Sequence, residues 1–351
     1  MLKLPNAARI TLRRVLLLLF SVSILVITPG CGLFGAHKEV QVPKLLTPLA
    51  QSNKTPLIRE INRLASLKSI RGKVDIQFED TSFASAGIAE KYRQVDGTVI
   101  LQRPGRIYLA IQFTFVDIAQ MASDGEHFTV AVLKGDEKYR RFVKGTNNAV
   151  YPKLDGDGSG SETKKTKQKT EKETVNVLSN LRPQHLTDAL MIRPVVEDGS
   201  FIYSQSEFFQ VEPDIRPEAK KDSRIMRGYY LLEELSQPTG GEARLLRRFW
   251  FDRVNGIRLA RLQTFDDRGL LITEVGYSNE KAFGPGQFVM PSRIELTRPQ
   301  DQYKLSITYQ DPTAVELDKE YRPEAFVLEN KGQLPEVDLD AQLNKKAKTN
   351  P

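Results

Sequence analysis

The sequence predicts a mainly β protein of the α+β class, built around a single curved antiparallel sheet. Stretches in which apolar and polar residues alternate recur along the chain, as in residues 303–309, and this alternation is typical of half-buried strands. Turn-forming residues such as Arg103-Pro104-Gly105 separate these stretches. Short strands joined by tight turns pair antiparallel, because parallel strands need a long crossover connection.

Few segments have the spacing of a helix. Apolar residues predict one amphipathic helix of about four turns from Leu57 onward, and a second over residues 172–190, interrupted near Arg182-Pro183. The predicted strands include residues 74–78, 97–102, 106–115, 127–133, 201–211, 226–235 and 303–309. A sheet of about ten or eleven strands rarely stays flat, so we expect a half-barrel with two or three helices covering its concave face.

Residues 1–30 have the pattern of a secretory signal peptide. A basic patch precedes an apolar run of 13 residues, 15–27, whereas a helix that spans a bilayer needs about 20. Cys31, the only cysteine of the chain, follows this segment and resembles the modified cysteine in the lipobox of bacterial lipoproteins. The resemblance implies that Cys31 is lipidated and becomes the mature N-terminus. The alternative is an ordinary cleaved signal followed by an incidental cysteine.

The charge and the cysteine count exclude several classes of function. Cleavage after residue 30 removes four basic and no acidic residues, so the net charge falls from +7 to +3. A chain so nearly balanced offers no electrostatic case for binding nucleic acid. With Cys31 lipidated, no thiol remains for a disulfide, a zinc–thiolate site or a cysteine nucleophile.

The mature chain is predicted to hold one domain. Residues 31–56 carry the lipidated N-terminus and scattered prolines, and are predicted to form a flexible tether. The domain covers residues 57–330 and is interrupted at about 144–174 by a glycine- and lysine-rich insert, which is predicted to be disordered. Residues 331–351 form a polar tail.

No constellation of catalytic or metal-binding residues stands out in the sequence. The three histidines, His37, His127 and His185, lack the mutual spacing of metal ligands. There is no Gly-x-Ser-x-Gly elbow, no phosphate loop and no dinucleotide fingerprint. We therefore predict a protein that is not an enzyme and that holds neither a cofactor nor a metal.

Three weaker signals have a functional and a plainer interpretation. Residues 155–166 begin like a calcium loop, but Thr166 stands where a bidentate glutamate is needed, which favours a flexible loop. Glu233 and Glu234 are adjacent on a strand and point to opposite faces, so they are predicted to be surface residues rather than an acid pair. Trp250 lies among arginines and could offer a cation–π platform, although packing within its strand is the favoured interpretation.

A series of motifs in a fixed order resembles the lipoprotein-localisation family of LolA- and LolB-like proteins. The motifs are Gly97-Thr98, Arg103-Pro104-Gly105, Ser123-Asp124-Gly125, Trp250-Phe251-Asp252, Asn255-Gly256 and the Pro-x-x-Ile-x-Leu step Pro291-Ser292-Arg293-Ile294-Glu295-Leu296. The resemblance covers residues 57–330 outside the insert. The last step resembles the LolB side of the family, whose members are themselves lipoproteins.

The resemblance implies a half-barrel whose helices cover an apolar cavity for acyl chains. In the family, the arginine of the Arg-Pro turn holds the helical lid by hydrogen bonds, which makes Arg103 the expected lid-holding residue. The cavity candidates are the inward apolar strand residues Leu109, Ile111, Phe113, Val130, Leu305 and Ile307. Each of these can equally be plain core.

The leading hypothesis is a non-enzymatic outer-membrane lipoprotein, anchored through Cys31 and facing the periplasm, whose cargo is a lipid or a lipidated protein. Gly32 is not the aspartate that retains lipoproteins at the inner membrane, which by resemblance implies the outer membrane. The alternative is a structural or regulatory envelope lipoprotein that binds a periplasmic protein partner, and a self-filled interior would favour it. A hydrolase is disfavoured because no nucleophile–base pair is apparent.

Overall fold

The computed structural model describes residues 42–82, 89–113, 116–134, 137, 140–149, 151, 181–238, 240–254 and 256–349. Residues 44–351 belong to one compact unit. The predicted signal peptide, Cys31, His37, the calcium-like loop and the helix predicted at 172–180 lie outside the described residues.

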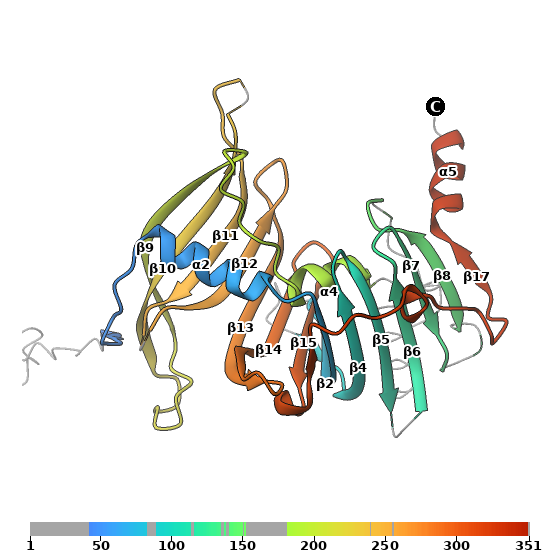
Figure 1. Cartoon of the computed structure of the whole chain (residues 1–351), viewed down its shortest axis with the longest axis horizontal. Helices are drawn as coiled ribbons and strands as arrows, with labels where there is room; N and C mark the ends of the chain where they lie inside the picture. The colour runs from blue at the N-terminus through green and yellow to red at the C-terminus, as the bar shows by residue number, and fades with distance from the viewer. Residues whose placement is uncertain are drawn as a thin grey trace, which may run out of the picture. The chain divides into compact units, whose positions relative to one another are not determined.

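The described residues form one sheet of 17 strands with three α-helices (Figure 1). The strands are β1 (Lys44–Leu45), β2 (Ser69–Asp80), β3 (Glu90–Lys91), β4 (Val95–Gln102), β5 (Arg106–Phe113), β6 (Val116–Ser123), β7 (His127–Val132), β8 (Arg141–Thr146), β9 (Phe201–Pro213), β10 (Arg224–Ser236), β11 (Leu245–Asp252), β12 (Arg258–Phe265), β13 (Leu271–Phe283), β14 (Phe288–Arg298), β15 (Tyr303–Tyr309), β16 (Glu316–Leu317) and β17 (Glu336–Asp338). The helices are α2 (Lys54–Ala65), α4 (Pro183–Leu190) and α5 (Leu339–Thr349).

The sheet is not closed. From one edge to the other the long strands run β9, β10, β11, β12, β13, β14, β15, β2, β4, β5, β6, β7 and β8, and β17 lies beyond β8. The short strands β1, β3 and β16 pair along β10 and β2 beyond the ends of longer neighbours. The mainly β class and the single sheet are as predicted.

Two details of the predicted sheet are wrong. It is mixed rather than purely antiparallel, because β1 pairs parallel with β10 and β17 pairs parallel with β8. Both parallel strands come from the ends of the chain, which reach the sheet without a hairpin. The strand count exceeds ten or eleven because several strands have only two or three residues, and because β6 was not predicted. Small and polar residues occupy much of β6, so its alternation is weak.

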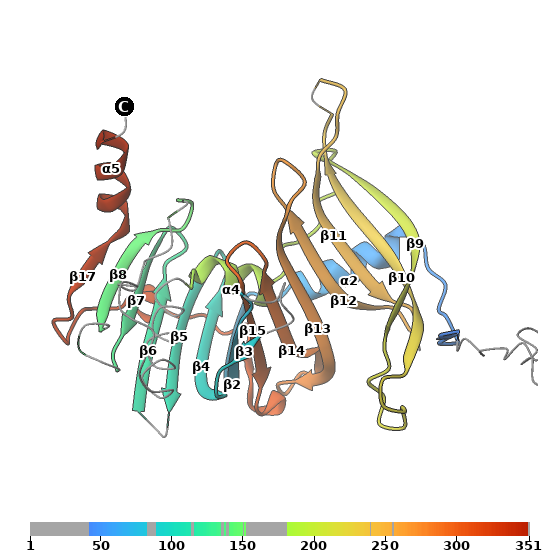
Figure 2. The same ribbon diagram turned by 180° about the vertical axis from the view of Figure 1, so that it is seen from behind.

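Two helices lie on one face of the sheet, which we call the inner face (Figures 1 and 2). α2 crosses the end of the sheet that contains β12 and buries residues such as Leu57 and Ile61, while α4 lies over β5, β6 and β14. α4 begins at Pro183, where a proline without an N–H is tolerated. Each large apolar side chain buried here stabilises the fold by about 1.5–3 kcal/mol. α5 lies against β8 instead and covers little of this face.

The opposite face, which we call the outer face, is crossed by the C-terminal segment. This segment passes from β16, beside β2, through the 3₁₀ helix Pro323–Phe326 against β5, and on to β17 beside β8. Phe326 is 2% exposed and anchors it. Within the predicted polar tail, residues 336–338 form β17 and residues 339–349 form α5.

The described part of the predicted tether lies along the sheet. β1 pairs with β10, Leu49 bridges to Val254, and Ala50 accepts a hydrogen bond from the buried guanidinium of Arg253. Asn53 caps α2 by accepting a hydrogen bond from the Thr55 N–H. These contacts hold residues 44–53 in place, since they complete the edge of β10 where β11 ends.

Two of the motif turns pack against each other. Gly105 and Gly125 both have positive φ angles, of 62° and 105°, and a Cβ atom at Gly125 would lie 2.8 Å from the carbonyl oxygen of Pro104. Asn147 holds the second of these turns by donating hydrogen bonds to the Ser123 hydroxyl and the Gly125 carbonyl. The Arg-Pro-Gly and Ser-Asp-Gly turns are thus parts of one packed end of the sheet.

We expect Gly97→Ala to lower the free energy of unfolding by about 1–3 kcal/mol, because the added methyl group overpacks the sheet. A Cβ atom there would lie 2.7 Å from Cδ1 of Ile76 and 3.0 Å from the carbonyl oxygen of Ala110. Gly276→Ala, also within a strand, is the matched control, since its nearest new contact is 3.9 Å. Denaturant unfolding of both variants checks this, and equal effects would contradict it.

Candidate functional site

A short extended segment joins α4 to β9 across the inner face. We call residues 192–196 the strap. No residue of the strap belongs to a helix or a strand. The side chains of Ile192 and Val195 are buried in the apolar core, 5% and 4% exposed. Together α4 and the strap cover the centre of the inner face.

Side chains from four other elements hold the strap. Every carbonyl group from residue 192 to residue 196 accepts a hydrogen bond from a side chain. The donors are Arg103 Nη2 to Ile192 (2.7 Å), Arg247 Nη1 to Arg193 (3.0 Å), Arg247 Nη2 to Pro194 (3.1 Å), Asn62 Nδ2 to Val195 (3.1 Å) and Tyr203 Oη to Val196 (3.1 Å). Buried carbonyl groups need partners, and here side chains replace the backbone pairing of a strand.

Arg103 connects the strap to both helices. Its Nε donates to the carbonyl oxygen of Leu67, just after α2, at 2.9 Å, while its Nη2 holds Ile192, just after α4. Burial lowers the pKa of Arg103 from its ordinary value. The position of Arg103 in a tight turn after β4 brings the guanidinium under the ends of both helices, so one residue joins three elements.

Arg247 is held by a buried ion pair. Its Nε donates to a carboxylate oxygen of Glu234 at 2.8 Å, and the two residues are 7% and 4% exposed. The hydroxyl of Tyr203 shares its single proton between the Val196 carbonyl and, at 3.0 Å, a carboxylate oxygen of Glu234. Burial together with this carboxylate raises the pKa of Tyr203 to about 12. The prediction that Glu234 is a surface residue is therefore wrong.

Alternation along the two strands indicates that both members of this pair are buried. Side chains two residues apart on a strand point to the same face. Arg247 therefore shares a face with Phe249, and Glu234 shares one with Leu232, and both of these apolar residues are fully buried. A charged residue on the buried face of a strand predicts either an oppositely charged partner or a functional site. Only the pairing of β10 with β11 reveals that the two charges face each other, through Glu234 opposite Arg247.

α4 is fixed to the strands beneath it by further polar contacts. His185 Nδ1 lies 3.1 Å from the hydroxyl of Tyr303, and Tyr277 donates to the carbonyl oxygen of Ala189 at 3.0 Å. Before the helix, the guanidinium of Arg182 lies 5.4 Å from the ring centroid of Phe128. Sheet side chains thus contact α4 at both of its ends.

A small hollow lined by described residues lies between this cover and the sheet. A cavity of about 30 Å³ remains where the ends of α2 and α4 meet β13, β14 and β15. It is lined by Leu64, Leu67, Leu190, Ile192, Tyr277, Met290, Pro291, Ile294 and Tyr309. About 10–15 Å³ of such space is enough for one water molecule, so this cavity is far too small for an acyl chain in the closed form.

Five of the six predicted cavity residues lie in one buried core. These are Leu109, Ile111, Val130, Leu305 and Ile307, each at most 4% exposed. Phe113 lies apart, 40% exposed at the end of β5, where the guanidinium of Arg93 stacks on its ring. None of the six lines the 30 Å³ cavity.

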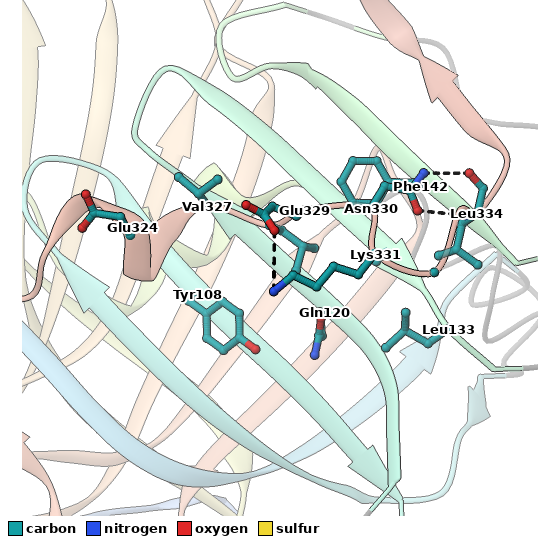
Figure 3. Close-up of a pocket in the computed structure, with 13 residues that line it drawn as sticks. Tyr108, Gln120, Leu133, Phe142, Glu324, Val327, Glu329, Asn330, Lys331 and Leu334 are labelled. Carbon is teal, nitrogen blue, oxygen red and sulfur yellow. Dashed lines mark hydrogen bonds and ion pairs between the residues drawn. The ribbon is translucent and has the colours of Figure 1, made fainter.

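Larger hollows lie on the outer face. A groove of about 520 Å³ runs between the strands and the loop at residues 327–334 (Figure 3). Its floor includes Tyr108 and Phe142, and its rim carries Glu324, Glu329 and Lys331. A second groove, of about 490 Å³, is lined mainly by polar residues of β2 and of residues 310–316, which follow β15. Both grooves have charged side chains in their lining.

Within the described residues, no three potential ligands gather to hold a metal ion. His127 is exposed beside Asp124. Trp250 is 7% exposed and packs edge-on against Phe208 and Tyr229, which confirms strand packing, with Arg261 stacked on its ring. No helix among the described residues is both long and apolar enough to cross a membrane.

No protein-family model matches the chain, and no curated protein matches it by sequence. Three solved structures are similar to it in part. A LolA superfamily protein from Nitrosomonas europaea is 11% identical, with a TM-score of 0.39 over 79% of this chain and 99% of that one. A DUF1329 family protein from Desulfovibrio piger is 10% identical, with a TM-score of 0.40 over 80% and 96%.

The third is a domain from Vibrio parahaemolyticus described as an outer membrane lipoprotein-sorting protein. It is 9% identical, with a TM-score of 0.36 over 80% of this chain and 97% of that one. LolA-type proteins, which the sequence motifs resemble, are thus among these structures. At this level of similarity the function has to be argued from the chain's own residues.

We expect His185 to make the fold sensitive to acid. Burial, and then the neighbouring Arg298 and Arg182, lower its pKa from 6.5 to about 3, against the opposing effect of Asp301. His185 is therefore neutral in the fold while the unfolded chain takes up a proton. The resulting stability is complete above pH 6.5 and is lost as pH falls toward 3, at up to about 1.4 kcal/mol per pH unit.

The measurement is the free energy of unfolding at pH 7, 6 and 5 for the parent and for His185→Gln. The glutamine keeps a polar group near Tyr303 but does not titrate. The difference between the two proteins should shift in favour of the variant as the pH falls. Parallel pH profiles would show that His185 is not the group responsible.

Proposed function

We propose that this protein is a non-enzymatic envelope lipoprotein whose covered apolar interior binds acyl chains of lipids or of lipidated proteins. The observation that carries the proposal is the cover. The strap lies over an apolar face and is held at all five carbonyl groups by side chains rather than by a strand. Such contacts can break without unravelling the sheet.

The apolar burial lost when the cover opens is comparable in energy with the burial gained when an acyl chain binds. Lifting the cover would expose the large apolar side chains of Leu186, Met191, Ile192 and Val195, which are at most 6% exposed. At about 1.5–3 kcal/mol for each side chain, this costs about 6–12 kcal/mol. An acyl chain with about 15 methylene groups gains about 12 kcal/mol at about 0.8 kcal/mol per group. A single chain can therefore offset the apolar part of the cost of opening, to which the hydrogen bonds of the strap add.

Of the hollows described, the inner one suits this cargo best. It is lined by aliphatic and aromatic side chains, and Arg103 lies at its margin as the residue that would hold the lid. The outer groove at Tyr108 is larger but carries charged side chains on its rim. Acyl binding needs removal from water rather than placed charges, which favours the interior.

One observation favours a second function. The cavity that described residues line under the cover measures only about 30 Å³, as expected for a fold that has no cargo. On this alternative the protein is a structural or regulatory envelope lipoprotein that binds a periplasmic protein. The two candidates differ in whether the cover opens.

We expect the chain without residues 1–37 to take up a fluorescent acylated peptide, and organic extraction followed by mass spectrometry to find acyl species bound to it. Arg103→Ala should accelerate uptake about tenfold or more, because two hydrogen bonds from a charged group hold the cover at about 1.5–3 kcal/mol each. Stopped-flow fluorescence measures the rate.

The matched control is Arg71→Ala, which removes an exposed arginine paired with Glu316 on the outer face. Its uptake rate should equal that of the parent. If neither the parent nor Arg103→Ala binds acyl species, the carrier function is excluded and the protein-binding alternative takes its place.

We propose that Cys31 carries the lipid and that the protein faces the periplasm from the outer membrane. Cys31→Ser should abolish incorporation of labelled palmitate and move the protein from the membrane to the soluble fraction. Metabolic labelling and membrane fractionation measure these effects. Retention in the membrane without label would point to a different anchor.

A further inference from the structure

β9 is an edge strand whose outer side pairs with no strand among the described residues. It has 13 residues and pairs with β10 along its whole length without a bulge. The unpaired N–H and C=O groups of such an edge form a template for another strand. Proteins usually protect long edges, so an unprotected one calls for a partner.

Several of the usual protective devices are missing from β9. It contains no lysine and no proline before Pro213, and its edge carries exposed apolar side chains at Ile202, Phe208 and Phe209, which are 38%, 41% and 44% exposed. A lysine, a proline or a bulge would obstruct a second strand. β9 instead has the composition of a strand that pairs with a neighbour on both sides.

The opposite edge of the sheet shows the contrast. There β8 is covered by β17, which has three residues, and Lys144 forms ion pairs with Glu336 and Asp338 at 3.1 and 3.9 Å. A short strand and a cluster of charges close this edge. Only the β9 edge of the described sheet is both long and uncharged enough to accept a partner.

We propose that β9 pairs antiparallel with β9 of a second copy of this chain, about a two-fold axis at Ser206. The inner face of the strand is self-complementary in this register, since Tyr203 lies opposite Phe209 and Phe201 opposite Val211, so apolar residues meet apolar ones there. On the outer face Ile202 lies opposite Gln210 and Phe208 opposite Ser204. Residues 201–211 of the two copies would form about ten backbone hydrogen bonds.

The charge of Glu207 disfavours two neighbouring registers. Glu207 is opposite Gln205 and keeps its own ion pair with Arg253 at 2.7 Å. Moving the axis to Glu207 would set two glutamates directly opposite each other, which is destabilising. Moving it to Phe208 would set Glu207 opposite Phe209. A two-fold interface in which the same strand serves both copies needs no other partner.

Ser206 and Ser204 provide a matched pair for the test, since both are exposed and share a face of β9. At the axis the two Ser206 Cα atoms would lie about 4.5–5.5 Å apart, within the range of a disulfide. The two Ser204 Cα atoms would lie four residues out of register, about 13 Å apart and beyond that range.

The experiment uses the full chain in its membrane, with Ser206→Cys, Ser204→Cys and the parent each treated with a mild oxidant. We expect Ser206→Cys to give a reducible band of twice the monomer mass, and the other two proteins to remain monomers. Mass spectrometry identifies the band. A Ser206→Cys protein that stays monomeric, cross-links to another protein, or cross-links no better than Ser204→Cys would overturn the proposal.

Charge reversal tests the same axis without a covalent bond. Ser206→Lys alone and Ser206→Glu alone should each sediment as monomers, because like charges meet at the axis, whereas their mixture should form the dimer again. Sedimentation velocity in detergent measures the masses. If both single variants remain dimers, the axis does not pass through Ser206. This test is independent of what the interior binds.

Discussion

The fold depends on one constraint, which is that a single open sheet with an apolar face needs a cover. α2 supplies part of that cover by burying an amphipathic stripe. The remainder is α4 and the strap, whose backbone lacks the partners that a strand would have. Arg103, Arg247, Asn62 and Tyr203 supply those partners from four separate elements. The cover is therefore fixed in position without being part of the sheet.

In this arrangement the stability of the sheet and the stability of its cover have different sources. The strands share a continuous ladder, so their stability is collective, while the cover is held by a small set of individual hydrogen bonds and by apolar burial. Three of the five bonds to the strap come from the charged donors Arg103 and Arg247, which makes each of these three stronger than a neutral bond, at about 1.5–3 kcal/mol. The buried pair of Glu234 and Arg247 is costly to desolvate and is retained where it holds two carbonyl groups of the strap. A cover of this kind is suited to open as a unit.

The two faces of the sheet differ in polarity, and its two edges differ in length and charge. The inner face is apolar and covered by helices, whereas the outer face is polar near β14, where Arg293 and Lys304 pair with Glu295. Aromatic residues return to the outer face at the β9 end, where Trp250 packs against Phe208. One edge ends in the short, charged β17 and the other in the long, unprotected β9. The two proposals rest on this asymmetry, since acyl cargo is proposed for the covered apolar face and a second copy for the β9 edge.

Local patterns in the sequence were sufficient for the class of fold, because alternation and turn residues act over a few positions. They predicted the strand at residues 303–309, the motif turns at Gly105 and Gly125, and the position of Arg103 in a turn. They did not predict β6, whose small residues alternate weakly, or the parallel strands β1 and β17, which pair with distant residues.

The tertiary structure alone decided how the candidate site is assembled. Arg103 reaches Ile192, which is 89 residues away, and Arg247 reaches Arg193 across 54 residues. Such contacts depend on strand register and on where a helix ends, and neither is encoded by the spacing of nearby residues. The sequence by itself determined which side chains are apolar, charged or turn-forming. The order of the strands decided which of them meet, because hydrogen bonds and close packing require contact in space.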